Sequence, residues 1–309
     1  MIPSKTTSPG WLAFEMNVLR RLEFTSAALP FTGEPNLGAY LKRSNARVLA
    51  NDLTQSAFVK AVAAIQNNGE PLSDEDVETV LEDAYVPRYR LQNPALRNWF
   101  NETDSWWFDN VRQNIERLPS LFTKATAMTL AMQSGNYLLS FKEETRELRQ
   151  PLSTVFRRFR STFPAPVNNG QNNACHNKNA VDFIAENFAD LMFLRLPRAH
   201  NLSLRNALGA AAWQEEWLQA GDTFWADLET AQTGRLGTHV ETKNQYLRLV
   251  EDLLKTAAHI GKWAIAHTED GFISTHELVE TVSRVRHVDT IFTKDFSELT
   301  GMKAVIITA

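Results

Sequence analysis

The chain has little of several features that mark specialised classes of protein. It carries one cysteine, Cys175, among 309 residues, so no internal disulfide can form. No run approaches the roughly 18–20 apolar residues that a membrane-spanning helix needs, and the first residues lack the apolar centre of a secretory signal. These absences predict a cytoplasmic protein that makes no contact with a membrane.

An excess of positive charge is missing as well. The chain has 32 Lys and Arg against 36 Asp and Glu, a net charge of −4, so its overall charge gives no sign of nucleic-acid binding. Its 43% hydrophobic and 22% charged residues are typical of a globular protein. At roughly 100–200 residues per domain, the length predicts one large domain, or one domain with a sizeable insertion.

Metal-ligand and nucleophile motifs are also lacking. The chain has no zinc-ligand spacing, no phosphate-loop lysine and no nucleophile elbow. Residues 266–277 mimic the end of a calcium loop, but Ala266 would stand at its first ligand position and cannot bind a cation. Cys175 and His176 lie in an Asn-rich segment without a third ligand nearby. The sequence therefore predicts no metal site.

The first 68 residues have the pattern of an α/β sheet. A helix is expected over 11–22, and strands are expected over 24–31 and 47–50. Each strand is followed by a turn and a helix, over 37–43 and 55–68, which favours parallel strands.

The middle of the chain changes character. Residues 70–83 hold seven acidic residues and no basic one, and Ser73 with Asp76 can start a helix. Residues 85–165 are helical in pattern and rich in aromatic residues and arginine, with no strand pattern. We interpret this region as an α-helical insertion.

The sheet pattern resumes after a loop predicted over 164–179. Strands are expected over 189–194 and 262–267, and helices over 180–187, 213–231, 241–260 and 275–285. Two final strands, over 287–294 and 303–309, are predicted to form a hairpin-like pair. These six strands, with the terminal antiparallel pair, would suit one open seven-stranded sheet flanked by helices.

Two strand ends carry candidate ligand-binding residues. Phe31, Gly33 and Gly38 lie in or after the turn that follows the first strand, where glycine lets the backbone approach a ligand. Asp52 ends the next strand, about 20 positions after that turn, where a carboxylate can accept hydrogen bonds from ribose hydroxyls. A purely structural turn remains an alternative for each.

A basic stretch follows the insertion. Residues 146–205 hold nine basic and four acidic residues, and Arg157, Arg158 and Arg160 are candidates for contact with DNA phosphates. If the fold places this stretch and the acidic residues 70–83 on different faces, the basic face can meet phosphates.

The order of these motifs along the chain resembles that of the Dam-like class of DNA adenine methyltransferases, which use S-adenosylmethionine. The segments ALPFTGEPNLGAYLKR and RVLAND resemble the family's cofactor turn and acidic strand end. Asp182-Phe183 resembles its Asp-Phe pair, ADLMFLRLPR the strand with the catalytic tetrapeptide, and AHTEDGFIS a late strand with its turn.

The resemblance covers most of the chain and implies a fold and a domain layout. It implies an open, mostly parallel, seven-stranded methyltransferase-like (Rossmann-like) sheet built from residues 1–68 and 166–309, with residues 69–165 in the position of the DNA-recognition region. It implies DNA as partner, a place in restriction and modification, and cofactor contacts from Phe31, Gly33, Gly38, Asp52, Asp182 and Phe183.

The chain departs from this family at the residues that carry the chemistry. The catalytic tetrapeptide Asp-Pro-Pro-Tyr reads Arg195-Leu196-Pro197-Arg198. Arg195 cannot accept a hydrogen bond from an adenine amine, and Arg198 offers no aromatic ring for the flipped base. Pro35 replaces the second glycine of the turn and has no N–H, which opposes cofactor binding.

Three hypotheses follow. The first is an inactive relative that binds DNA or a partner, such as an active methyltransferase companion chain. The second is an active S-adenosylmethionine-dependent DNA adenine methyltransferase with displaced chemistry, in which Asp190 or His200 supplies the missing acceptor. The third is a scaffold without a role in nucleic-acid binding.

Overall fold

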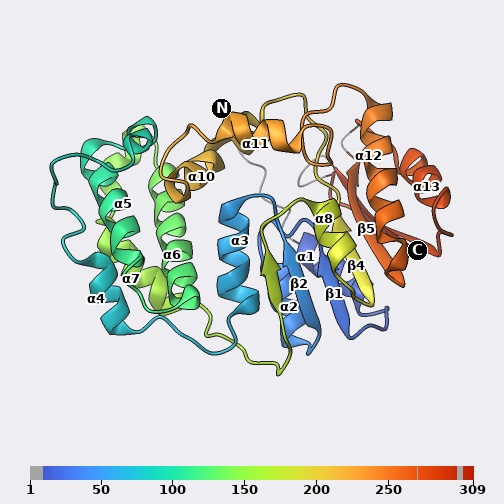
Figure 1. The fold of residues 1–309 in the computed structure, drawn as a ribbon, viewed down its shortest axis with the longest axis horizontal. Coiled ribbons are helices and arrows are strands. Elements are labelled where there is room, and N and C mark those ends of the chain that lie inside the picture. The colour runs from blue at the N-terminus through green and yellow to red at the C-terminus, as the bar shows by residue number, and fades with distance from the viewer. Residues whose placement is uncertain (1–9, 270, 298–301) are drawn as a thin grey trace.

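The sheet confirms the predicted α/β fold class. The computed structural model describes residues 10–269, 271–297 and 302–309, drawn in Figure 1. Within these residues, seven strands form one open sheet in the order β3-β2-β1-β4-β5-β7-β6. β1 to β5 are parallel, and β7 is antiparallel to its neighbours β5 and β6. The strands are β1 (Ser26–Leu29), β2 (Arg47–Asn51), β3 (Ala174–His176), β4 (Leu191–Arg195), β5 (Lys262–Glu269), β6 (Thr290–Asp295) and β7 (Lys303–Thr308).

Helices cover both faces of the sheet. Met192 and Leu194 of β4 pack into the core under α8, α12 and α13, whereas Leu191 and Phe193 pack into the core under α1 and α2. This alternation follows the two-residue period of a strand, and burial on both faces explains why residues 191–194 are all apolar. The helices are α1 (Trp11–Leu19), α2 (Asn36–Arg43), α3 (Gln55–Ala61), the π-helical turn η1 (Val62–Gln66), α8 (Ala180–Glu186), α12 (Lys243–Thr256), η5 (Ala257–His259) and α13 (Thr275–Ser283).

A second group of helices lies beside the sheet, at the left of Figure 1. Its core holds Trp107, Phe108 and Phe156, all fully buried. We call this group the helical part; it comprises α4 (Asp74–Leu81), η2 (Pro94–Asn98), α5 (Glu102–Ile115), α6 (Leu121–Leu139), η3 (Glu143–Leu148) and α7 (Leu152–Thr162). In the ranges that the structure describes, no helix is long and apolar enough to span a membrane.

Helix α10 (Ala212–Leu218) packs against the helical part although it follows β4 in the chain. All seven of its residues are buried. Trp213 lies so close to Gly135 of α6 that a Cβ there would be 2.3 Å from the indole ring. Trp217 donates its indole N–H to the carbonyl of Phe108 at 2.9 Å. The predicted division at residues 68 and 165 remains a prediction, and α10 packs across it.

Two predicted elements differ in detail. The predicted loop 164–179 contains the edge strand β3, which forms through pairing with β2 rather than through an apolar pattern. The single helix predicted over 213–231 is two helices, α10 and α11 (Trp225–Gln232), because Ala220 has φ +56° and interrupts the helical backbone. Two short helices, α9 (Leu204–Leu208) and η4 (Gly209–Ala211), precede α10.

Candidate functional site

The carboxyl ends of β1 and β2 bring the predicted glycine turn and Asp52 together. The two strands are parallel neighbours, so the residues that follow them meet at one edge of the sheet. Gly33 has φ +55°, and its N–H donates to Oδ2 of Asp52 at 2.8 Å. The N–H of Thr32 donates to the carbonyl of Asn51 at 2.9 Å. Two features predicted to bind a cofactor therefore bind each other.

The Asp52 carboxylate finds its other donors within the same turn. Its Oδ1 accepts hydrogen bonds from the N–H of Thr54 at 3.0 Å and from the Thr54 hydroxyl at 2.8 Å. Burial raises the pKa of Asp52 above its ordinary value, although these bonds and the one from Gly33 act against the rise. The carboxylate is thus hydrogen-bonded without any ribose hydroxyl.

Glu215 of α10 occupies the adjacent start of α3. Its carboxylate accepts hydrogen bonds from the N–H groups of Gln55 at 2.9 Å and Ser56 at 2.8 Å. Burial raises the pKa of Glu215, and the nearby Asp52 raises it further. A helix start that could hold an anionic ligand is filled by a carboxylate of the chain itself.

Arg195, at the first position of the altered tetrapeptide, forms an ion pair with Glu15 of α1. Its Nε and one terminal nitrogen each lie 2.6 Å from a different carboxylate oxygen of Glu15. The other terminal nitrogen donates to the carbonyl of Thr32 at 3.3 Å. Glu15 is fully buried and also accepts the indole N–H of Trp11 at 2.7 Å. The guanidinium therefore links β4, α1 and the glycine turn.

These contacts close the space between β1 and β4. The hollow there leaves no volume that a water-sized sphere can enter; it is lined by Leu29, Phe31, Thr32, Glu34, Leu37, Gly38, Phe193 and Arg195. This hollow is too small for S-adenosylmethionine, the cofactor that the resemblance implies. Arg195 lines this hollow, whereas Pro35 does not.

The other residues predicted to bind the cofactor have structural contacts. Gly38 lies against Ile65, where a Cβ would be 2.3 Å from Cδ1, so close packing of α2 requires glycine here. Phe183 is fully buried in the core, and its neighbour Asp182 pairs with Arg235 at 3.2 Å. Phe31 is half-buried and packs against the same core as Phe183.

The rest of the altered tetrapeptide continues from β4. The N–H of Leu196 donates to the carbonyl of Ala266 at 2.9 Å, and the carbonyl of Pro197 accepts the Tyr246 hydroxyl at 2.7 Å. Arg198 is exposed, and its guanidinium lies 3.3 Å from the sulfur of Met302.

The two proposed replacement acceptors, Asp190 and His200, are not equivalent. Asp190 precedes β4 and therefore lies at the opposite edge of the sheet from Arg195. It accepts hydrogen bonds from the N–H and hydroxyl of Thr25 and from the N–H of Ser26, which lower its pKa to about 2. His200 follows β4, and its Nδ1 lies 3.1 Å from the carbonyl of Leu202. Asp190 cannot serve chemistry at the carboxyl edge.

Two of the three predicted DNA-contact residues of α7 pair with the acidic helix α4. Arg157 binds Glu78 through two bonds of 2.6 and 3.0 Å, and Arg160 lies 2.9 Å from Asp74. Arg158 lies over the ring of Tyr137 at 5.3 Å and donates to Gln150. At α7 the basic stretch therefore lies beside the acidic stretch, so the condition that the two lie on different faces is not met there.

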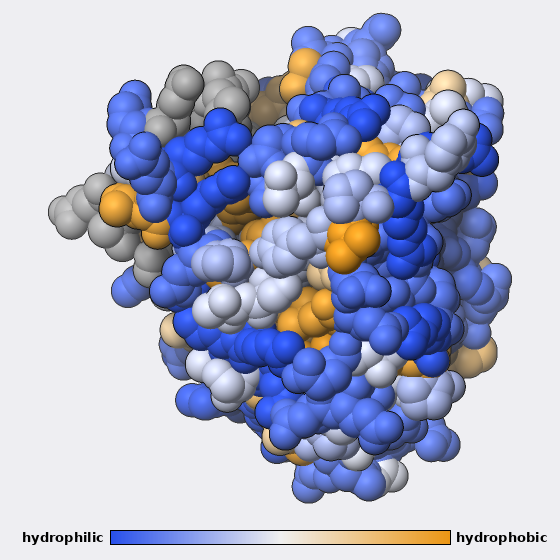
Figure 2. All heavy atoms as spheres, turned by 90° about the vertical axis from the view of Figure 1, so that its left-hand side faces the viewer, coloured by the Kyte–Doolittle hydropathy of each residue, from blue (hydrophilic) through white to orange (hydrophobic). Residues whose placement is uncertain are grey.

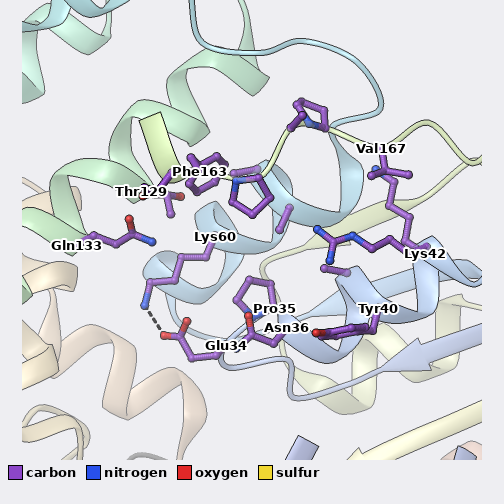
Figure 3. A pocket seen from close by; sticks show the side chains of 18 of the residues that line it. Glu34, Pro35, Asn36, Tyr40, Lys42, Lys60, Thr129, Gln133, Phe163 and Val167 are labelled. Atoms are coloured by element: carbon purple, nitrogen blue, oxygen red, sulfur yellow. Dashed lines mark hydrogen bonds and ion pairs between the residues drawn. The ribbon is translucent and has the colours of Figure 1, made fainter. Parts of the chain in front are cut away.

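A cleft of about 520 Å³ opens beside the glycine turn, between α2, α3, α6 and residues 162–167. Figure 3 shows Lys60 of α3 reaching Glu34 in this cleft, with their charged atoms 2.7 Å apart. Pro35 lines the cleft, whereas Asp52 and Arg195 do not. Glu34 lines both the cleft and the closed hollow, so the two adjoin at the glycine turn.

Glu15 and Glu215 were missed by the sequence analysis. The signal for Glu15 was one acidic residue inside the apolar run WLAFEMNVL, because a buried carboxylate needs a cation or several donors. Arg195 at the end of a buried strand was the matching signal. Glu215 lies within α10, between Trp213 and Trp217, and had no comparable signal.

Comparison with known proteins gives one distant relative. No family model matches the chain. The chain is 22% identical over 301 residues to the Type II methyltransferase M2.HphI of Haemophilus parahaemolyticus, an alignment that covers 88% of this chain and 84% of that protein. This similarity extends across both the sheet and the helical part. Together with the methyltransferase-like sheet, it supports a relationship between this chain and the methyltransferases.

Proposed function

We propose that this protein is a methyltransferase relative that binds DNA and does not transfer methyl groups. The observation that carries the proposal is the Arg195–Glu15 ion pair at the carboxyl end of β4. Methyl transfer to an adenine amine needs a hydrogen-bond acceptor at this position, and a guanidinium has only donors. The same guanidinium is held by Glu15 and the Thr32 carbonyl, so it is fixed at this strand end.

The closed edge of the sheet supports the same proposal. Gly33 and Asp52 bind each other, and Arg195 fills the space beside them. A cofactor would have to break several of these hydrogen bonds on binding. DNA as partner rests on the resemblance to DNA methyltransferases, which places a recognition region at residues 69–165.

A methyl-transfer assay tests the proposal. We expect no radiolabel in DNA when the protein is incubated with tritiated S-adenosylmethionine, and no heat of binding in calorimetry with S-adenosylmethionine alone. The Asp52→Ala variant is the matched control. Incorporation by the wild-type chain that this variant loses would establish an active enzyme and overturn the proposal.

The DNA part of the proposal is tested separately by fluorescence anisotropy with a labelled duplex. We expect binding that weakens as salt is added, because phosphate contacts release counterions. If the wild-type chain neither binds DNA nor transfers methyl groups, the proposal is wrong and the hypothesis of a scaffold without a role in nucleic-acid binding is favoured.

A further inference from the structure

The chain between α4 and η2 carries a short segment with exposed side chains. Residues 85–90 are all exposed, and Tyr89 has no part of its side chain covered. Arg88 and Arg90 flank Tyr89. This segment runs along the outer side of the helical part, at the left of Figure 1. An exposed aromatic ring between two arginines offers a stacking surface beside two positive charges, the combination that nucleic-acid-binding surfaces use.

The backbone of this segment is held by buried side chains of α5. The side-chain amide of Asn110 donates to the carbonyls of Asp83 at 3.3 Å, Ala84 at 3.1 Å and Val86 at 2.9 Å. The amide of Asn114 donates to the carbonyls of Val80 at 3.2 Å and Glu82 at 2.7 Å.

Asp109 fixes the other end of the segment. Its two oxygens accept the N–H groups of Gln92 at 3.0 Å and Asn93 at 2.9 Å. Asp109, Asn110 and Asn114 are at most 3% exposed. The segment is thus anchored at both ends, so a partner would not have to order its backbone, which favours affinity.

The charge of this segment is available to a partner. Among the described residues, no Asp or Glu oxygen lies within 4.0 Å of the Arg88 or Arg90 guanidinium, and Arg88 donates to the neutral side chain of Gln113. Arg157 and Arg160 of α7, by contrast, are paired with acids. The nearest acids along the chain are Asp83 and Glu82, and Glu82 pairs with Arg117.

The surrounding face is mostly hydrophilic, unlike the apolar centre of a stable protein interface. This side of the molecule faces the reader in Figure 2, where hydrophobic residues form small separate areas among hydrophilic ones. Stable protein interfaces have an apolar centre, whereas protein–DNA interfaces are more polar and positively charged.

We infer that Arg88, Tyr89 and Arg90 form a DNA-contact surface, with both guanidinium groups on backbone phosphates and the Tyr89 ring against a sugar or base. This inference rests on the proposed DNA binding and names where it occurs. This location for the DNA contact takes the place of the one predicted at Arg157 and Arg160, whose charges are paired with acidic residues of the chain.

Anisotropy titrations of a labelled DNA duplex between about 50 and 200 mM salt test the inference. We expect the R88A/R90A double variant to bind at least about tenfold more weakly and to lower the slope of log affinity against log salt by about 2, one for each phosphate contact. Tyr89→Ala should weaken binding without changing that slope, because the tyrosine is neutral. The matched control is Arg157→Ala, which should change neither quantity.

The outcomes separate the inference from the proposed function. If the wild-type chain binds DNA and the double variant binds equally well with the same slope, the inference is wrong and the proposed function stands. If the wild-type chain shows no DNA binding, both are wrong, and a protein partner is favoured for this surface. Unchanged melting temperatures, expected for exposed side chains, show that the variants remain folded.

Discussion

Glu15 and Arg195, 180 residues apart in the chain, form a two-bond ion pair at the edge where the resemblance places an acidic catalytic residue. Glu15 is fully buried, while the Arg195 side chain is 23% exposed. A lone arginine at the end of a buried strand would be costly, and α1 supplies its counterion. The first residue of the altered tetrapeptide, Arg195, is therefore matched by a buried counterion, Glu15.

The first prediction concerns the stability that this pair provides. Arg195→Met leaves the Glu15 charge buried without its counterion, so we expect the free energy of unfolding to fall by about 3 kcal/mol. Glu15→Gln leaves a partly exposed arginine and should cost less, about 2 kcal/mol. The double variant should cost less than the sum of the two, measured by urea unfolding. Strictly additive losses would show that the two side chains do not stabilise each other.

The second prediction concerns Gly38, which the resemblance assigned to the cofactor and the structure places against Ile65. Gly38→Ala should lower the free energy of unfolding by about 1–2 kcal/mol, because overpacking outweighs the helical preference for alanine. Ile65→Val removes Cδ1, so the double variant Gly38→Ala/Ile65→Val should recover part of the stability that Gly38→Ala loses. Gly69→Ala is the control, since a Cβ there meets nothing within 4 Å. Equal losses from both alanine variants would argue against the packing role.

The third prediction follows from Asp190, whose pKa is lowered to about 2 by hydrogen bonds from Thr25 and Ser26. A carboxylate with a lowered folded-state pKa adds stability above its ordinary pKa of 3.8 and loses it as the pH falls toward 2. Because Asp190 is exposed, we expect a contribution of about 1 kcal/mol. The Asp190→Asn variant should be less stable than wild type at pH 6, and this gap should close between pH 4 and pH 2.

Unfolding free energies measured at several pH values check this prediction, with the exposed Asp222→Asn variant as the control. A gap between wild type and Asp190→Asn that stays constant down to pH 2 would contradict it.

Local patterns predicted the sheet because its central strands are buried on both faces and therefore read as short apolar runs. The predicted strand 189–194 lies within two residues of the observed Leu191–Arg195. The meeting of Gly33 and Asp52 was predictable too, because the ends of parallel neighbouring strands share an edge. Strand β3 was not, because its three residues depend on pairing with β2 and carry no pattern of their own.

The contacts that decide the chemistry depend on long-range packing. Glu15 meets Arg195, and Glu78 meets Arg157, across 180 and 79 residues, and neither pairing follows from a local pattern. Composition showed an acidic and a basic stretch, but not that α4 and α7 would face each other. The sequence could therefore place the strand ends. Only the structure shows that Arg195 and Arg157 are already paired with acidic residues of the same chain.

The last prediction concerns Cys175 of β3, a half-buried cysteine that we expect to react slowly. Burial raises the pKa of its thiol to about 12, although the backbone hydrogen bond to Gln66 and the nearby Lys42 charge lower it. At pH 8 only about one thiol in 10⁴ is then ionised, and the thiolate is the reactive form.

We expect the native protein to react with a disulfide reagent far more slowly than the urea-unfolded chain. The native rate should rise about tenfold per pH unit up to pH 10, because the thiolate fraction is still far from saturation. The Cys175→Ser variant gives the background. A native rate that levels off near pH 8 or 9 would instead indicate an ordinary, accessible thiol and would reopen a chemical role for this residue.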